Sequence, residues 1–247
     1  MAHKTLLWML ATSLALLPAR LAPQDAPPPI RSSSVNGINI PAIPGAPFSA
    51  TVVVESELYV DDVEAQVYRT IGLIARDSQG RTHNETRRLM PESFHGSPAL
   101  LSLRLYDPET RIRIVCDPGS KIARREIVPQ KPPAASPAPN PTLRTEDLGM
   151  TTLNGLQAKG TRRTFAAPRA HLGWGKRPEV QEETWYSEDL HIDLLTRLTD
   201  SRVGVQTIGI SNLKRGEPTA SMFQVPPGYR IFNVVEPPPQ PAAGSTR

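Results

Sequence analysis

The sequence predicts a mainly β protein, an antiparallel meander of about ten strands with few short helices. Apolar and polar side chains alternate with a period of two, clusters of turn residues separate these runs at roughly ten-residue spacing, and no long amphipathic helical pattern interrupts them. In such strands successive side chains point to opposite faces, so we expect one face of the sheet to pack and the other to contact water.

The first residues have the features of a secretory signal peptide. Lys4 precedes an apolar run from Leu6 to Leu17 that is too short to span a bilayer, and small residues suited to cleavage follow. We expect cleavage after Ala19; Ala22 and Ala26 are alternatives, but each is followed by proline, which hinders cleavage. An uncleaved anchor is the other interpretation. The mature chain is expected to be exported to the periplasm or the extracellular space, soluble and without a transmembrane segment.

The 27 prolines are concentrated in three places, which divide the chain. We expect a signal peptide at 1–19, a proline-rich disordered segment at 20–47, a first meander block at 48–128, a proline-rich linker or loop at 129–141, a second block at 142–235 and a disordered tail at 236–247. The sequence leaves open whether the two blocks form one sheet or two.

The first block alternates strands with aspartate-led turns. Strands are expected at 48–55, 66–76, 81–89, 100–106, 111–116 and 121–128. Asp77-Ser-Gln-Gly80 marks a hairpin, and an Asp-Pro pair begins the turns at Asp107 and Asp117. Aspartate accepts backbone bonds there and proline presets φ, which predicts type I turns.

The second block repeats this arrangement with different turns. Strands are expected at 148–153, 156–165, 179–186, 190–198 and 203–213. Asn154-Gly155 predicts a type I′ hairpin, because both central positions of that turn need positive φ. Proline at 218 suits the first turn of a helix, so one helical turn is expected over 217–222.

Charge and cysteine content exclude some classes of protein. A formal charge of +4 is too small to indicate a nucleic-acid-binding protein. The single cysteine, Cys116, cannot form an intramolecular disulfide, so the exported chain must rely on an ordinary core. Cys116 shares a strand face with Ile112 and Ile114, which favours a buried cysteine over a nucleophile.

The candidate metal ligands are Asp189, His191 and Asp193, which would share one face of a strand. The opposite face would then carry Leu190, Ile192 and Leu194, as in any half-buried strand, and a solvated polar face is the favoured interpretation. No nucleophile elbow, phosphate loop or Cys-x-x-Cys pair is present. We therefore expect no catalytic residue, no cofactor and no enzymatic activity.

Three aromatic residues are the candidates for contact with a ligand or partner. Trp174 lies between two glycines, where its indole would be prominent or would fold back over the sheet. Trp185 and Phe223 are expected in the core, although the core of a curved sheet can also be the wall of a ligand site.

The closing residues carry a family resemblance. The pattern from Trp185-Tyr186-Ser187 through Pro218 to Phe223-x-Val225-Pro-x-Gly228-Tyr229 resembles the end of the outer-membrane lipoprotein carrier (LolA/LolB-like) half-barrel. The segments at 74–81 and 160–164 are also similar to exported proteins common in acidobacteria.

The resemblance implies an open half-barrel whose concave apolar face carries acyl chains or senses mislocalised lipoproteins. We accordingly expect an exported, non-catalytic envelope protein that binds a lipid, a lipoprotein acyl chain or a protein partner on that face. A periplasmic regulator of an envelope stress response and a metal-dependent enzyme using the 189–193 face are the alternatives.

Overall fold

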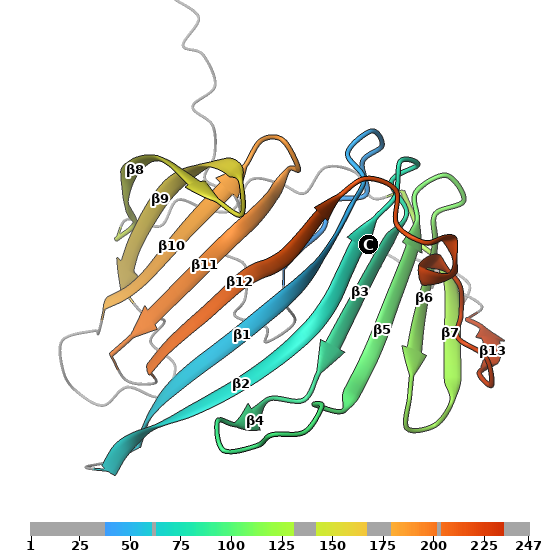
Figure 1. The fold of residues 1–247 in the computed structure, drawn as a ribbon, viewed down its shortest axis with the longest axis horizontal. Coiled ribbons are helices and arrows are strands. Elements are labelled where there is room, and N and C mark those ends of the chain that lie inside the picture. The colour runs from blue at the N-terminus through green and yellow to red at the C-terminus, as the bar shows by residue number, and fades with distance from the viewer. Residues whose placement is uncertain (1–37, 61–62, 131–141, 167–178, 202–203, 235–247) are drawn as a thin grey trace, which may run out of the picture.

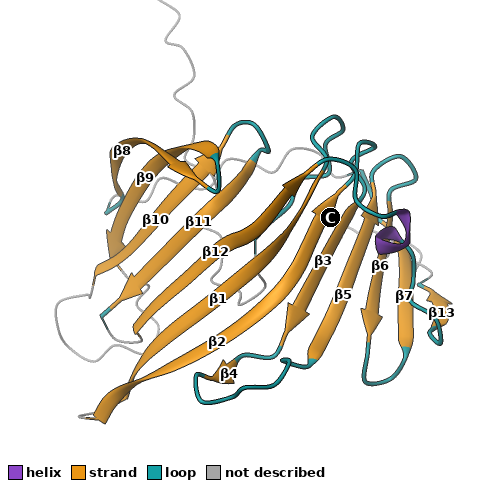
Figure 2. Ribbon diagram, viewed as in Figure 1, coloured by secondary structure: helices purple, strands orange, loops and turns teal. Residues whose placement is uncertain are grey.

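The chain forms one large open sheet, seen in a computed structural model that describes residues 38–60, 63–130, 142–166, 179–201 and 204–234 (Figure 1). The strands are β1 Phe48–Val60, β2 Val63–Arg76, β3 Thr82–Arg87, β4 Met90–Pro91, β5 Leu100–Asp107, β6 Ile112–Asp117, β7 Ile122–Ile127, β8 Arg144–Leu153, β9 Leu156–Ala166, β10 Glu179–Ser187, β11 Ile192–Asp200, β12 Gly204–Arg215 and β13 Arg230–Asn233. Among the described residues the only helical element is the short 3₁₀ turn η1, Ala220–Phe223 (Figure 2). The predicted mainly β half-barrel is confirmed.

Two antiparallel meanders meet in the middle of this sheet. The order is β13-β7-β6-β5-β3-β2-β1-β12-β11-β10-β9-β8, with β4 paired to β2. The long β1–β12 pairing, Phe48 with Arg215 through Leu58 with Gly204, joins the first meander to the second. Strands from both predicted blocks therefore belong to one sheet.

Within the described residues the sheet has thirteen strands rather than the expected ten or so. Alternation did not reveal β4, which has only two residues, or β13, in which all four residues are exposed. The strand expected from residue 190 begins at Ile192, because residues 188–191 form a turn.

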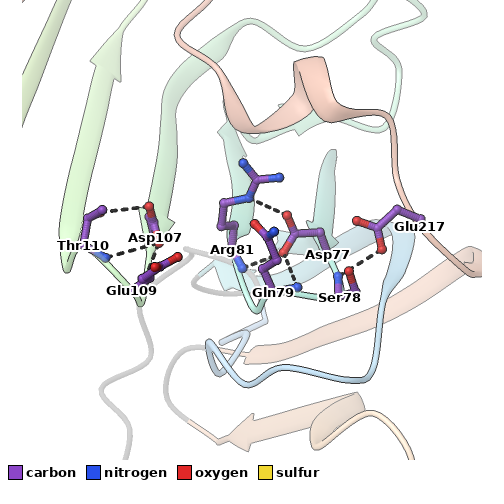
Figure 3. A network of polar contacts seen from close by, with 8 residues as sticks. All are labelled: Asp77, Ser78, Gln79, Arg81, Asp107, Glu109, Thr110 and Glu217. Atoms are coloured by element: carbon purple, nitrogen blue, oxygen red, sulfur yellow. Dashed lines mark hydrogen bonds and ion pairs between the residues drawn. The ribbon is translucent and has the colours of Figure 1, made fainter.

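The aspartate-led turns form as predicted, and Figure 3 shows those at Asp77 and Asp107. Asp107 Oδ1 accepts a bond from the Glu109 amide at 3.0 Å, and Asp117 repeats this with Gly119 at 2.9 Å. In the β2–β3 hairpin, Asp77 accepts bonds from the amides of Gln79 and Arg81 and pairs with the Arg81 guanidinium. Asn154 and Gly155 have φ of 50° and 77°, which confirms the type I′ turn.

The main core lies on one face of the central strands, which we call the Val54 face. Paired residues of adjacent strands point to the same face, so Val54 shares it with Thr70 of β2 and Ile208 of β12. Residues 38–47, which precede β1, cover part of it, with Ile38, Ile40 and Ala46 packed there. The buried members are Ile38, Phe48, Ala50, Val52, Val54, Ile74, Leu156, Ala158, Leu190, Ile192, Leu194 and Ile210.

A second core lies on the opposite face, which we call the Leu105 face. Leu105 pairs with His83, and His83 pairs with Ala75, whereas the neighbouring Asn84 pairs with Ile74 of the Val54 face. The cluster consists of Leu103, Leu105, Cys116 and Ala123 and is covered by Val225 and Tyr229. The expectation that one face of the sheet packs and the other contacts water is therefore wrong. The main core packs on the Val54 face, and the second core, around β5 to β7, packs on the Leu105 face.

The segment that covers the Val54 face is held by Arg76, whose side chain is fully buried. Its guanidinium donates to the carbonyl oxygens of Pro41 at 3.0 Å, of Ala46 at 3.1 and 2.9 Å, and of Leu190 at 2.7 Å. It also stacks over the Phe48 ring, 5.2 Å from its centroid. One side chain of β2 thus binds both the 41–46 loop and the β10–β11 turn.

The segment that covers the Leu105 face is held at His83. The His83 ring Nδ1 lies 2.6 Å from the Met222 carbonyl oxygen, and Nε2 lies 3.7 Å from the Glu85 carboxylate. Glu85 also accepts bonds from Arg87 at 2.9 Å and from the Leu73 amide at 3.3 Å. Burial by itself raises the pKa of Glu85, but the neighbouring His83 ring and the bonds from Arg87 and Leu73 together outweigh burial and hold that pKa below its usual value.

Replacing Arg76 with Met should lower the free energy of unfolding by about 3 kcal/mol or more, because one buried and two partly buried carbonyl oxygens lose their donor. Urea denaturation measures this. The matched control, Arg69→Met, removes an exposed pair with Glu55 and should cost less than about 1 kcal/mol. Equal losses in the two variants would show that Arg76 does not anchor the covering segment.

The Glu85 carboxylate should make stability depend on pH. Its folded pKa lies below its unfolded value, so its contribution is present above about pH 4.3 and is lost as the pH falls through the folded pKa. We expect the free energy of unfolding, measured by urea denaturation, to fall less between about pH 5 and 3 for Glu85→Gln than for the parent chain. The exposed Glu109→Gln is the control and should follow the parent; a Glu85→Gln curve that does the same would contradict this role.

Candidate functional site

A groove of about 470 Å³ opens between the segment before β1 and the β10–β11 hairpin. Its volume is in the range of small-ligand sites. The apolar residues of the lining are Pro41 and Ile43, which are half-buried, and Ile192, whose side chain is buried in the main core. The polar lining residues are Asn39, Tyr186, His191 and Asp193.

The β10–β11 turn positions the polar side of the groove. His191 adopts a left-handed conformation, with φ of 54°, as Arg111 and Lys121 do at the ends of their turns. Its ring Nδ1 lies 3.3 Å from the Tyr186 hydroxyl and 3.9 Å from the Glu188 carboxylate. Tyr186 in turn pairs with Asp193 across the two strands, so the turn brings these polar groups to one side.

The three predicted metal-ligand candidates do not share one strand face. Asp189 and His191 lie in the turn, and only Asp193 lies in β11. The Asp189 carboxylate pairs with Arg215 at 3.7 Å. In the described part of the chain no three His, Cys, Asp or Glu side chains are placed to hold a metal ion. Leu190, Ile192 and Leu194 are buried together, as their alternation predicted.

A β-bulge aligns β10 with this core. Between Trp185 and Tyr186 the pairing with β11 shifts by one residue, because β11 contains Leu194 as an extra residue. Beyond the shift, the fully buried Ser187 pairs with Ile192. Trp185, two residues before Ser187, also packs against the main core, and its indole lies over Gly160, where an added Cβ would come within 2.5 Å of the ring.

A buried positive charge lies behind the groove. The Arg76 guanidinium is bonded to the carbonyl oxygens of Pro41 and Leu190, which belong to the two segments that form the groove. Burial lowers the pKa of Arg76 from its usual high value. Both walls of the groove are therefore fixed to the same side chain.

The predicted contact residues lie in separate places. Trp174 is outside the described residues. Trp185 packs in the main core on the Val54 face, whereas Phe223 belongs to η1, in the segment that covers the Leu105 face, where the Arg81 guanidinium lies 5.2 Å from the centre of its ring. The structure does not bring Trp185 and Phe223 together in one site.

Little in the sequence indicated the groove. Asn39, Pro41 and Ile43 lie among prolines in the range 20–47 expected to be disordered, so their position carried no prediction. The apolar spacing of Ile38, Ile40 and Ile43 is the one signal that could have indicated packing there.

Cys116 has the predicted environment. It is fully buried in β6 among the apolar residues of the second core, and burial raises the pKa of its thiol. A raised pKa disfavours the thiolate, the reactive form. The described residues also include no helix that is long and apolar enough to cross a membrane.

Comparisons with known proteins give similarity at the level of the fold. No family model matches the chain, and no curated protein matches its sequence. An uncharacterized conserved protein from Thermus thermophilus is 9% identical with a TM-score of 0.39, over 76% of this chain and 90% of that one.

Two further solved structures have the same kind of similarity. The MucA/MucB complex of Pseudomonas aeruginosa is matched with 14% identity and a TM-score of 0.40, over 78% of this chain and 62% of that one. A LolA superfamily protein from Nitrosomonas europaea is 11% identical with a TM-score of 0.30, over 74% of this chain and 91% of that one. All three similarities, including the one to the LolA superfamily protein, are at low sequence identity.

Proposed function

We propose that the protein is an exported, non-catalytic envelope protein that binds an apolar ligand, an acyl chain of a lipid or lipoprotein, in the groove beside the β10–β11 hairpin. The groove of about 470 Å³, with Pro41, Ile43 and Ile192 in its lining, is the observation that carries this proposal. The signal-peptide features of the first residues support export.

The chemistry of the groove supports an amphiphilic ligand. Each methylene that leaves water for an apolar surface contributes about 0.8 kcal/mol, so a few methylenes against the half-buried Pro41 and Ile43 would give measurable affinity. Asn39, Tyr186 and His191 supply hydrogen-bonding groups for the polar end of such a ligand.

The groove is also built to keep its shape without a ligand. Arg76 ties the 41–46 loop to the turn at Leu190, and Gly80 allows the β2–β3 hairpin to approach Ile43, since an added Cβ would lie 2.9 Å from the Ile43 carbonyl carbon. A pre-formed site loses less conformational entropy on binding.

Filling the groove should weaken binding of an acyl probe. We expect dansylated undecanoic acid to bind the mature chain with increased fluorescence, and Asn39→Trp, at an exposed position in the lining, to weaken binding at least about tenfold. Ile71→Trp is the matched control, because Ile71 is exposed on the opposite face, and it should bind as the parent does. Thermal unfolding of each variant checks that the fold is kept.

Native mass spectrometry of protein purified from a bacterial periplasm should also show a co-purified lipid. Repeated preparations without lipid, or equal probe binding by the parent and Asn39→Trp, would overturn the proposal. His191→Ala separates the metal alternative: a stoichiometric metal in the parent that is lost in this variant would favour it.

A further inference from the structure

The edge strand β13 is unusual among the described strands because every one of its residues is exposed. Of the eight large apolar side chains exposed in the described part of the chain, four lie at this edge. They are Ile127 of β7 at 66%, Ile231 at 55%, Phe232 at 49% and Val234 at 48%. Exposed apolar side chains gathered in one place mark interaction surfaces more often than scattered ones do.

The outer side of β13 has free backbone groups. β13 runs parallel to β7, and the amides of Arg230 and Val234 donate inward to the carbonyl oxygens of Lys121 and Arg125 at 2.9 and 2.8 Å. Alternate residues of a parallel strand bond to opposite sides, so the N–H and C=O groups of Ile231 and Asn233 point outward. No strand in the described ranges pairs with that side.

The apolar side chains lie on both faces of this edge. Ile231 pairs with Ala123, a member of the cluster on the Leu105 face, whereas Phe232 pairs with Arg124 and so points to the other face. A strand added beside β13 would therefore find an apolar neighbour on each of its faces.

The charge at this edge is positive. Lys121, Arg124, Arg125 and Arg230 are all exposed, and within the described residues no ion pair engages any of them. Glu126 is the acidic residue of β7, and it is paired with Arg113 at 2.7 Å. Acidic side chains on an added strand would meet these cations.

We propose that β13 is a docking edge for an extended segment of a partner protein in which apolar and acidic side chains alternate. The partner adds a strand to the sheet, with main-chain bonds to Ile231 and Asn233. The neighbouring parts of this chain do not suit that role, because residues 129–141 contain no acidic side chain and both 129–141 and 237–241 are rich in proline, which lacks an amide donor. A membrane surface would leave the outward backbone groups without partners.

This edge is independent of the groove. In the sheet order the strands β7, β6, β5, β3, β2, β1 and β12 separate β13 from β11 (Figure 1). The two functions can therefore be tested separately: Asn39→Trp should weaken acyl binding, and Phe232→Glu should weaken strand docking.

A pool of seven-residue peptides that alternate Val or Ile with Glu, capped at both ends, tests the proposal on the mature chain. We expect binding that slows hydrogen exchange at the amides of Ile231 and Asn233 and leaves the already bonded Arg230 amide unchanged. A matched pool with proline at the central positions should not bind, because it lacks the donors.

Phe232→Glu should weaken peptide binding by at least about tenfold, by removing an apolar contact and adding repulsion. Met150→Glu is the matched control, because Met150 is exposed at 62% on the opposite edge strand β8, and it should bind as the parent does. Equal weakening in both variants would overturn the proposal, as would unchanged exchange at Ile231 and Asn233.

Two other results would assign the edge to a different occupant. A concentration-dependent dimer of the parent that Phe232→Glu abolishes, without peptide binding, would make a second copy of this chain the occupant. Binding to phosphatidylglycerol vesicles that Phe232→Glu abolishes, again without peptide binding, would make it a membrane contact. Each would overturn docking of a partner strand.

Discussion

The fold depends on the buried Arg76 guanidinium, whose bonded partners are backbone carbonyl oxygens and not carboxylates. Arg76 is fully buried, and its guanidinium is satisfied by backbone carbonyl oxygens of Pro41, Ala46 and Leu190. Removing a charged guanidinium from water costs free energy, and hydrogen bonds from its N–H groups must offset that cost. The loop and the turn that accept these bonds must therefore be in place together. The segment before β1 is thereby part of the core. The groove has the same origin, because its two walls are the segments that Arg76 joins.

An open sheet exposes apolar side chains on its faces, and in the described residues no α-helix covers them. Two covering segments bury part of these faces instead. Consecutive residues of β3 illustrate this arrangement, since His83 contacts the Met222 carbonyl oxygen on one face and Asn84 donates to the Ile38 carbonyl oxygen at 3.1 Å on the other. The alternation of a strand lets adjacent side chains bind segments from opposite ends of the described chain. Each segment covers only the half of the sheet whose apolar residues face it, and this division leaves other parts of both faces exposed.

The sequence predicted the features that arise from local chemistry. The turns at Asp107, Asp117 and Asn154 follow from side chains that bond their own backbone or tolerate positive φ, and the burial of Leu190 and Ile192 follows from alternation. It did not predict features set by distant contacts. His191 was expected in a strand, but the hairpin needs a left-handed residue there. The groove was not predicted because the high proline content around Pro41 and Ile43 indicated a disordered segment and not a packed one. Strand β13 was not predicted because its residues are exposed on both faces.

In the part of the chain that the structure describes, β8 and β13 are the two edges of the sheet, and they differ in charge. At β8 the charged side chains are neutralised within the chain: Glu146 pairs with Arg162 at 2.9 Å, Asp147 with Lys159 at 3.4 Å and Arg144 with Glu179 at 2.7 Å. Such cross-strand pairs add little stability at exposed positions, but they leave no net field for a partner. At β13 cations stand beside exposed apolar side chains and outward backbone groups. An edge that only needed protection from unwanted pairing would carry charge without Ile231 and Phe232, so their exposure favours recognition over avoidance.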